Sequence, residues 1–227
     1  MIVASHQPNF MPYMGFFYKM YLCDVFTFSD TVGFSNRGYH NYNHIANNGK
    51  KVKITVPISG RSGTISQVEL SQWEYHRVKL WRTLESCYCK APYFKELAPL
   101  FKEVILGSYT HLWELNLELI VLIHTLFGFE CKLFLESGLD IKGYTPSEQI
   151  ADICRKTHCD TYLSGDGAKV YLDEDHLNGE CINVIWANYE PLQYGSIENL
   201  SVFDYLMHNG AHIPEEWVKA KEALQRG

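Results

Sequence analysis

The sequence predicts an α/β fold with a Rossmann-like, mostly parallel sheet and a helical insertion. The first observation is that strand, polar turn, helix and strand follow one another within thirty residues, the pattern of a βαβ unit with parallel strands and a right-handed crossover. The second is that the same alternation returns in the second half. The alternating segments are 1–5, 15–23 and 25–28, and then 131–135, 146–156 and 161–164.

The N-terminal segments follow from local composition. Residues 1–4 are apolar and predict a buried strand that ends where polar residues begin. Residues 15–23 place apolar and aromatic side chains on one face of a helix, and Asp24 ends it before the strand at 25–28. Residues 33–50 are rich in Asn, Gly and Tyr without a clean period, which predicts a long irregular loop.

The middle of the chain is predicted to be mostly helical. Residues 51–57 alternate and predict a strand that Pro57 closes. A helical block of about residues 67–127 follows. Apolar residues recur there at three- and four-residue steps from Trp73 to Tyr88 and from Leu112 to Leu126, as amphipathic helices require, and 94–105 is a further helix. We treat residues 1–227 as one domain that contains this block.

Composition limits the class of protein. A hydrophobic content of 46% is enough for a full core, and a net charge of −6 argues against a nucleic-acid binder. No signal peptide is expected, and no apolar run approaches the ~18 residues of a membrane span. The seven cysteines contain no Cys-x-x-Cys pair, as in a reduced chain. We therefore expect a cytoplasmic protein.

Polar side chains follow the first two predicted strands. His6, Gln7 and Asn9 come directly after the first strand, and Asp30 follows the strand at 25–28. Ligands of α/β proteins bind at the carboxyl ends of strands, so these residues predict a site. His6 can carry a proton near neutral pH, and the amides can donate and accept hydrogen bonds. The structural alternative for His6 is a residue that caps the next helix.

Asp30 has two candidate partners in the predicted loop, Asn41 and Asn43. Asp30 can act as general base, metal ligand or hydroxyl acceptor. The alternative is an acid at a strand end whose oxygens accept hydrogen bonds from nearby backbone amides.

A third candidate site follows the strand at 161–164. The preceding helix has a clear start at Thr145-Pro146-Ser147-Glu148, with a cap, a proline at the first position and an acid three residues after the cap. Ser164, Gly165 and Lys169 belong to a turn with two glycines, which allows close backbone approach to an anion that Lys169 would neutralise. The turn is not a P-loop, and a glycine-rich turn without ligand is the alternative.

No metal site is predicted from the histidine pairs. His40 and His44 lie in an irregular segment, and Asn209-Gly210 interrupts the pair His208 and His212, whereas four-residue spacing brings two ligands together only on a helix.

Several further segments carry a resemblance to a known family. They are His6–Phe17, Asp30–Phe34 with Asn41–Ile45, Thr55–Ile58, Lys90–Phe94, and Tyr162–Gly165 with Tyr171–Asp173. In the same order, they resemble the blocks His-Gln-Pro-Asn-Tyr-x-Pro-Trp-x-Gly-Tyr-Phe, Asp-Asp-Val-Gln-Tyr…Asn-Arg-Asn-x-Ile, Thr-Val-Pro-Val, Lys-Ala-Pro-Tyr-Phe and Tyr-Leu-Ser-Gly…Tyr-Leu-Asp of the WbqC-like family of bacterial proteins. Together they cover nearly the whole chain.

The resemblance implies a role in sugar modification. WbqC-like proteins resemble products of gene clusters for polysaccharides such as O-antigen, and some are presumed to transfer glycine or another small acyl group to an aminosugar. We therefore expect a transferase of aminoacyl or acyl groups, with a sugar or nucleotide-linked substrate and an acyl or aminoacyl carrier as a further partner. Neither the residues nor the resemblance identifies a cofactor.

The resemblance also assigns roles. His6 would act as general base on the acceptor amine or stabilise the developing charge, and Asp30 would orient it or bind a sugar hydroxyl. Residues that would position the substrate are Gln7, Asn9, Tyr13, Asn41 and Asn43. The chain departs from the family blocks at Thr31, Gly33, Asn36 and Tyr42, where the family tends to have a second acid, Gln, Lys and Arg. The loss of a cation and an acid would change the charge preference for the ligand.

Two other functions stay open. One is a metal-dependent hydrolase or cyclising enzyme that uses His6 and Asp30 as ligands. The other is a non-catalytic scaffold protein in a biosynthetic complex.

Overall fold

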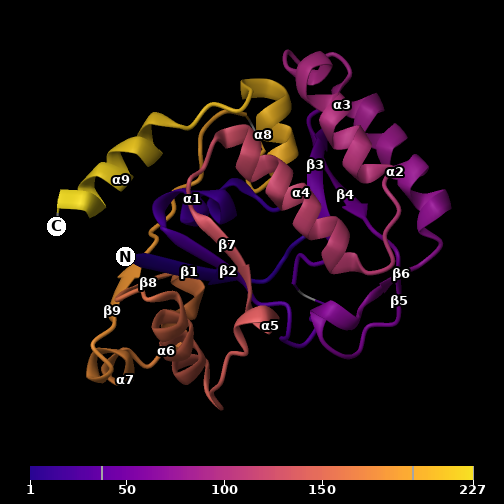
Figure 1. The fold of residues 1–227 in the computed structure, drawn as a ribbon. Helices are drawn as coiled ribbons and strands as arrows, with labels where there is room; N and C mark the ends of the chain where they lie inside the picture. The colour runs from indigo at the N-terminus through magenta and orange to yellow at the C-terminus, as the bar shows by residue number, and fades with distance from the viewer. Residues whose placement is uncertain (37, 196, 227) are drawn as a thin grey trace.

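A parallel sheet forms the centre of the molecule. The computed structural model describes residues 1–36, 38–195 and 197–226. In this part of the chain the central sheet has five strands in the order β7-β2-β1-β8-β9, all parallel. They are β1 (Ile2–His6), β2 (Val25–Phe28), β7 (Lys132–Leu135), β8 (Thr161–Ser164) and β9 (Asn183–Trp186). The predicted Rossmann-like α/β fold is confirmed (Figure 1).

Helices cover both faces of this sheet. On one face, Val3 and Val25 pack against α6 (Pro146–Thr157) and α7 (Glu174–Gly179). On the other face, Ala4 and Phe26 join the larger core with α1 (Met14–Leu22) and α4 (Leu112–Phe127). Side chains alternate between faces along a strand, so neighbouring residues of β1 contribute to different cores. Figure 1 shows α6 and α7 on one side of the strands and α1 and α4 on the other.

The chain reverses its direction of sheet growth at β1. From β1 it proceeds to β2 and β7 on one side, and later to β8 and β9 on the other. The carboxyl ends of β1 and β8 therefore flank a switch point, the place where open α/β sheets form their ligand crevice.

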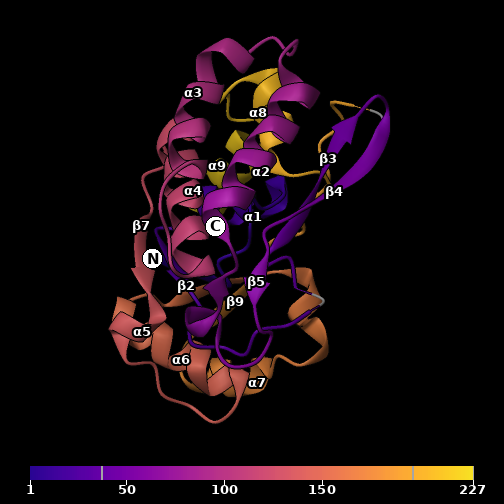
Figure 2. The same cartoon turned by 90° about the vertical axis from the view of Figure 1, so that its right-hand side faces the viewer.

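The helical block lies between β2 and β7 in the sequence. It contains α2 (Trp73–Tyr88), α3 (Phe94–Ile105) and α4, as the apolar spacing predicted. Figure 2 shows these helices together beyond the sheet, with α8 (Val202–Asn209) against them. Gly128 ends α4 in the left-handed conformation, with φ 66°, and the capping box of Thr145 and Glu148 starts α6 as predicted.

The expectation of an irregular loop over 33–50 is wrong for 42–47, and residue 37 lies outside the described part of the chain. Residues 42–47 form β3 (Tyr42–Asn47), which pairs with β4 (Lys50–Thr55) as an antiparallel hairpin that projects from the body (Figure 2). Asn48 and Gly49 connect the two strands with φ of 48° and 73°, the positive values of a type I′ turn.

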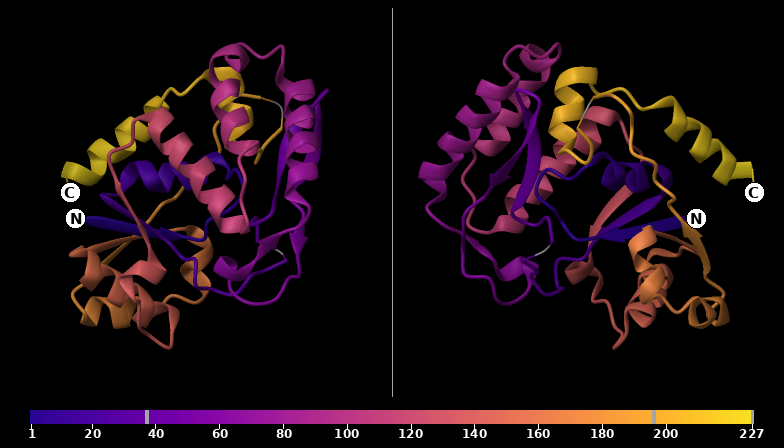
Figure 3. Two further views of the ribbon diagram at one scale, coloured as in Figure 1. Left: turned by 45° about the vertical axis from the view of Figure 1, so that its right-hand side comes forward. Right: turned by 180° about the vertical axis from the view of Figure 1, so that it is seen from behind.

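The remaining elements are short or C-terminal. They are β5 (Ile58–Ser59), η1 (Ile65–Gln67), β6 (Glu69–Leu70), α5 (Glu136–Leu139), η2 (Asp166–Val170) and α9 (Glu215–Arg226). Figure 3 shows α9 running along the side of the molecule, near the N-terminus. In the described ranges, no helix combines the length and apolar character needed to cross a bilayer.

Candidate functional site

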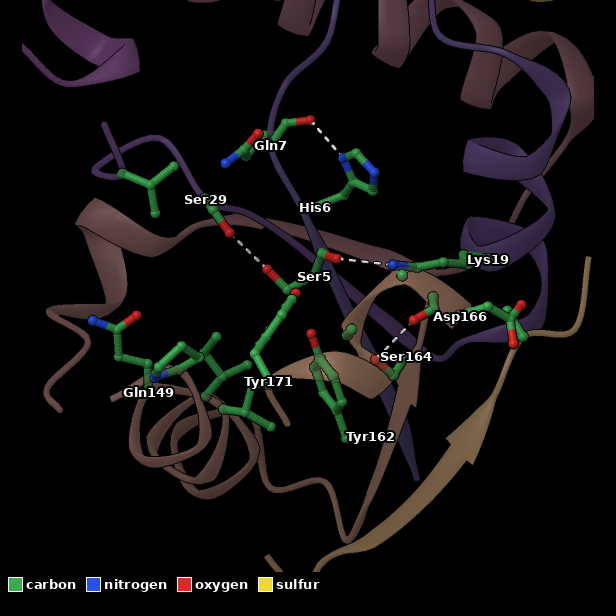
Figure 4. Close-up of a pocket in the computed structure, with 18 of the residues that line it drawn as sticks. Ser5, His6, Gln7, Lys19, Ser29, Gln149, Tyr162, Ser164, Asp166 and Tyr171 are labelled. Carbon is green, nitrogen blue, oxygen red and sulfur yellow. Dashed lines mark hydrogen bonds between the residues drawn. The ribbon is translucent and has the colours of Figure 1, made fainter. Parts of the chain in front are cut away.

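A cleft of about 690 Å³ opens at the switch point, beside the carboxyl ends of β1 and β8. Its walls come from β1, α1, the end of β2, the start of α5, α6 and the turn after β8. Figure 4 shows side chains from these separate elements pointing into one space. A volume of this size is within the usual range of small-molecule sites.

A buried carboxylate lies on the wall of the cleft. Glu136 follows β7 directly and is 6% exposed. Its Oε1 accepts hydrogen bonds from the Thr27 hydroxyl at 2.9 Å, the Ser29 hydroxyl at 2.9 Å and the Ser5 hydroxyl. The sheet register explains the convergence, because Ser5 pairs with Thr27 and Thr27 pairs with Phe134, so their side chains share a face. The Ser5 and Ser29 hydroxyl oxygens also lie 2.8 Å apart, so the carboxylate and the three hydroxyls form one hydrogen-bonded cluster.

A buried cation lies on the other side of Ser5. Lys19 of α1 is 7% exposed, and its Nζ donates a hydrogen bond to the Ser5 carbonyl oxygen at 3.0 Å (Figure 4). Burial lowers the pKa of Lys19 to about 8, because the charged form loses hydration. Among the described residues, no carboxylate forms an ion pair with this ammonium. Ser5 thus joins a carboxylate and an ammonium, one through its side chain and one through its backbone.

His6 is neutral in this setting. Its Nδ1 lies 3.0 Å from the Gln7 carbonyl oxygen, and the ring packs edge-on against Phe16. A carbonyl only accepts, so Nδ1 holds the proton and Nε2 keeps a lone pair. Burial, followed by the charge of Lys19, lowers the pKa of His6 to about 3. His6 is therefore a hydrogen-bonding group at neutral pH and a weak base.

The turn after β8 contributes polar and aromatic groups. Ser164 and Gly165 line the cleft with Tyr162 and Tyr171 (Figure 4). Burial and the nearby Glu136 raise the pKa of Tyr162, so its hydroxyl keeps its proton. Lys169 does not line the cleft.

The Lys169 ammonium has partners of its own. It pairs with Asp166 at 2.6 Å and lies over the Trp186 ring at 5.1 Å.

Asp30 lies behind this wall. Its carboxylate is 3% exposed and accepts a hydrogen bond from the backbone N–H of Ser137 at 3.0 Å. Asp30 does not line the cleft, but its hydrogen bond holds the first turn of α5, the helix that begins at Glu136. The role that the geometry supports is positioning.

The two loop asparagines hold backbone. Asn43 is buried, donates to the carbonyls of Phe10 and Met11 at 3.2 and 2.6 Å, and accepts from His44 N–H. Asn41 donates to the Val56 carbonyl at 2.9 Å. Asn43 thereby fixes the segment between β1 and α1, and Asn41 fixes the residue that follows β4.

The structure brings half of the predicted site residues together. Those that line the cleft are His6, Gln7, Tyr13, Ser164 and Gly165. Those that do not are Asn9, Asp30, Asn41, Asn43 and Lys169. Asn9 is 8% exposed and its Oδ1 has no hydrogen-bond partner in the described part of the chain.

Sequence reasoning missed Glu136 and Lys19, although both left a signal. Glu136 directly follows a predicted strand, which is the criterion that selected Asp30. Lys19 is the one charged residue of Met14–Leu22, an otherwise apolar and aromatic helix. A lysine is rarely buried without a partner, so a lone lysine on such a helix is a candidate functional residue.

The donor set for a metal is limited. No group of three or more His, Cys, Asp or Glu side chains in the described ranges is arranged to hold a metal ion. The proposed pair of His6 and Asp30 is divided, because His6 lines the cleft and Asp30 lies outside its lining.

Comparison with known proteins gives a family match over most of the chain. Residues 7–215 match the model of the WbqC-like protein family. The chain is 26% identical over 223 residues to "Uncharacterized protein Rv1507c" of Mycobacterium tuberculosis (strain ATCC 25618 / H37Rv), covering 94% of this chain and 96% of the relative. No solved structure matches the chain.

Proposed function

This chain belongs to the WbqC-like protein family, and on that premise we propose that it is a transferase that moves a small acyl or aminoacyl group onto the amine of an aminosugar. The reaction would serve polysaccharide or related natural-product biosynthesis. The observation that carries the proposal is the pair of opposite charges that converge on Ser5, Glu136 from β7 and Lys19 from α1.

The chemistry of acyl transfer to an amine sets two requirements. The amine must lose a proton as it attacks, so a base must be at hand. A nucleotide-linked sugar also brings negative charge that the site must neutralise. The carboxylate of Glu136 and the ammonium of Lys19 meet these two requirements on opposite sides of one strand residue.

In the proposed step, the acceptor nitrogen forms a bond to the acyl carbon while the bond from that carbon to its oxygen or sulfur carrier breaks. Glu136 receives the amine proton, which then passes to the leaving oxygen or sulfur. The three hydroxyls on Oε1 hold the carboxylate in place, leaving Oε2 for the incoming proton. The step involves no oxidation or reduction.

The other lining residues act in binding. His6 offers its Nε2 lone pair to an amine or hydroxyl proton of the acceptor, which fits a ring that stays neutral better than the role of general base. Gln7 and Ser164 supply further hydrogen bonds, and Tyr13 and Tyr171 supply aromatic surface for a sugar ring. Asp30 acts through Ser137 by fixing the turn that carries Glu136.

The test is a search for product. We would incubate the purified protein with nucleotide-linked aminosugars that have a free amine, together with acetyl-coenzyme A or glycyl-tRNA, and detect the N-acylated sugar by mass spectrometry. We expect Glu136→Gln to lower turnover by about 100-fold or more, the typical value of a lost general base. Lys169→Met, which removes a cation outside the cleft, is the matched control and should retain turnover.

Full turnover by Glu136→Gln would reject Glu136 as the base. Absence of any N-acylated product with all donors and acceptors would reject the transferase.

A further inference from the structure

A second cavity lies on the side of α1 that faces α9. We call it the tyrosine pocket and define it by Tyr18, Tyr189, Tyr194, Tyr205 and Trp217. Its volume is about 540 Å³, and its walls come from α1, the segment after β9, α8 and the start of α9. Figure 3 shows α1, α8 and α9 on the same side of the sheet.

The aromatic rings of the tyrosine pocket form two groups of contacting rings, one of Tyr18, Tyr189 and Trp217 and one of Tyr194 and Tyr205. The ring centroids of Tyr18 and Tyr189 are 5.5 Å apart, those of Tyr18 and Trp217 are 5.5 Å apart, and those of Tyr194 and Tyr205 are 5.2 Å apart. Trp217 and Tyr205 are buried, while Tyr18, Tyr189 and Tyr194 are partly exposed toward the pocket. Such rings offer negative faces to cations and flat apolar surface to the C–H face of a pyranose.

The charge of the tyrosine pocket is negative. Glu190 and Glu216 line it, and no Lys, Arg or His is among its lining residues in the described part of the chain. Neither carboxylate has an ion-pair partner among the described residues. Both act on the aromatic wall, since Glu190 adds to the burial that raises the pKa of Tyr18, and Glu216 does the same for Tyr205.

A structural role accounts for only one of these acids. Glu216 lies in the first turn of α9, where a negative charge stabilises the helix. Glu190 lies outside any helix, in the segment after β9. Both acids are exposed to solvent, so their charge is available to a ligand in the pocket.

The tyrosine pocket and the cleft share a wall. Tyr189 lines both cavities. A small hollow between them is lined by Tyr13, which also borders the cleft, and by Tyr194, which also borders the tyrosine pocket. Tyr13 and Tyr189 contact each other edge-on at 5.9 Å. The two cavities are thus neighbours divided by the Tyr13–Tyr189 contact, and a ligand that occupies both must pass over these two rings.

We infer that the tyrosine pocket is a binding site for a protonated aminosugar unit, held by its ammonium against Glu190 and Glu216 and by its ring on the tyrosines. The inference rests on the proposed function for the choice of an aminosugar over another ammonium compound. It adds a substrate class, an acceptor of at least two sugar units with a free amine outside the reacting one.

The test is binding without any acyl donor. We would measure the affinity for a glucosamine disaccharide by calorimetry at about pH 6, where its amines are protonated, and for the N,N′-diacetylated disaccharide, which is neutral. We expect the neutral sugar to bind at least about 10-fold more weakly, because it loses both the ion pairs and the cation–π contacts.

Variants locate the bound sugar. The double variant Glu190→Gln with Glu216→Gln should lose about 10-fold or more in affinity for the glucosamine disaccharide. Glu215→Gln, which removes a neighbouring exposed acid of α9 that does not line the pocket, is the matched control and should bind as the wild type does.

Two results would overturn the inference: equal binding of the charged and neutral sugars, or unchanged affinity in the double variant. Loss of affinity in Glu136→Gln together with unchanged affinity in the double variant would place the whole disaccharide in the cleft and would overturn the inference. The absence of N-acylated product, by contrast, would reject the transferase without affecting the binding measurement, which needs no acyl donor.

Discussion

The carboxylate of Glu136 accepts a hydrogen bond from the hydroxyl of Ser5 across an intervening strand. Glu136 follows β7 and Ser5 belongs to β1, while β2 lies between these strands and adds the hydroxyl of Thr27 to the same oxygen at 2.9 Å. The contact ties three strand ends together at the edge where the cleft opens. Glu136 therefore contributes to the stability of the fold as well as to the proposed chemistry, and separate variants can distinguish the two contributions.

Removal of the Glu136 carboxylate should destabilise the fold. Glu136→Ala leaves three hydroxyls of the strand ends without their acceptor, and we expect the free energy of unfolding to fall by about 2–3 kcal/mol. Urea denaturation measures this value. Glu130→Ala, at an exposed acid, should change it by less than about 0.5 kcal/mol, and an equal effect of both variants would contradict the buried network.

Binding of an anionic ligand should weaken as the pH rises through about 8. The Lys19 ammonium, whose pKa burial lowers to about 8, loses its charge there, well below the ordinary range for lysine. Titration of a nucleotide-linked aminosugar between about pH 7 and 9.5 measures the loss. Lys19→Arg should stay charged and remove the pH dependence, whereas an unchanged profile in that variant would assign the titration elsewhere.

Acid should destabilise the protein through two histidines. Burial is the main cause that lowers the pKa of His6 to about 3 and that of His40 to about 4. Below about pH 6.5 the two histidines are therefore protonated in the unfolded state but still neutral in the native state. Stability therefore falls as the pH drops from about 6.5 toward 4, by about 1.4 kcal/mol per pH unit for each histidine.

Denaturation at several pH values tests this slope. His40→Gln should flatten it, and His212→Gln, at an exposed histidine, should not. A slope that survives in a double His6→Gln, His40→Gln variant would show that other groups cause the acid loss.

The segment between β1 and α1 should depend on Asn43. Its amide holds the carbonyls of Phe10 and Met11, and Met11 has the uncommon φ of 42°. We expect Asn43→Ala to lower the free energy of unfolding by about 3 kcal/mol, because a buried turn loses its donors. Asn41→Ala, which removes one bond of a partly exposed side chain, should cost about 1 kcal/mol. Equal losses would argue against the buried role of Asn43.

Four strands of the sheet, β1, β2, β7 and β8, were predicted from their apolar residues and the amphipathic helices between them, whereas β9 was not predicted. His6 and Ser164 were each selected as residues at strand ends, and they line one cleft because β1 and β8 are neighbours. The order of strands, however, depends on packing between distant segments, so sequence order alone does not bring Glu136 of β7 within reach of Ser5.

Local signals account for two of the differences. Asn48-Gly49 is the strongest short-range signal of a hairpin, and the polar composition around it obscured β3. Lys169 and Asp166 are three residues apart in a 3₁₀ turn, so the two side chains meet and the ammonium forms an ion pair with Asp166. The cation of the cleft comes instead from Lys19, whose burial depends on the packing of α1 against the sheet.

The most direct measurement is a thermal-shift comparison of four proteins with a nucleotide-linked aminosugar: wild type, Lys19→Met, Glu136→Gln and Lys169→Met. A ligand that binds the native state raises the melting temperature. We predict that the wild type and Lys169→Met are stabilised by the ligand and that Lys19→Met is not, with Glu136→Gln still binding through Lys19. Stabilisation of Lys19→Met equal to that of the wild type would contradict the assignment of this cleft as the substrate site.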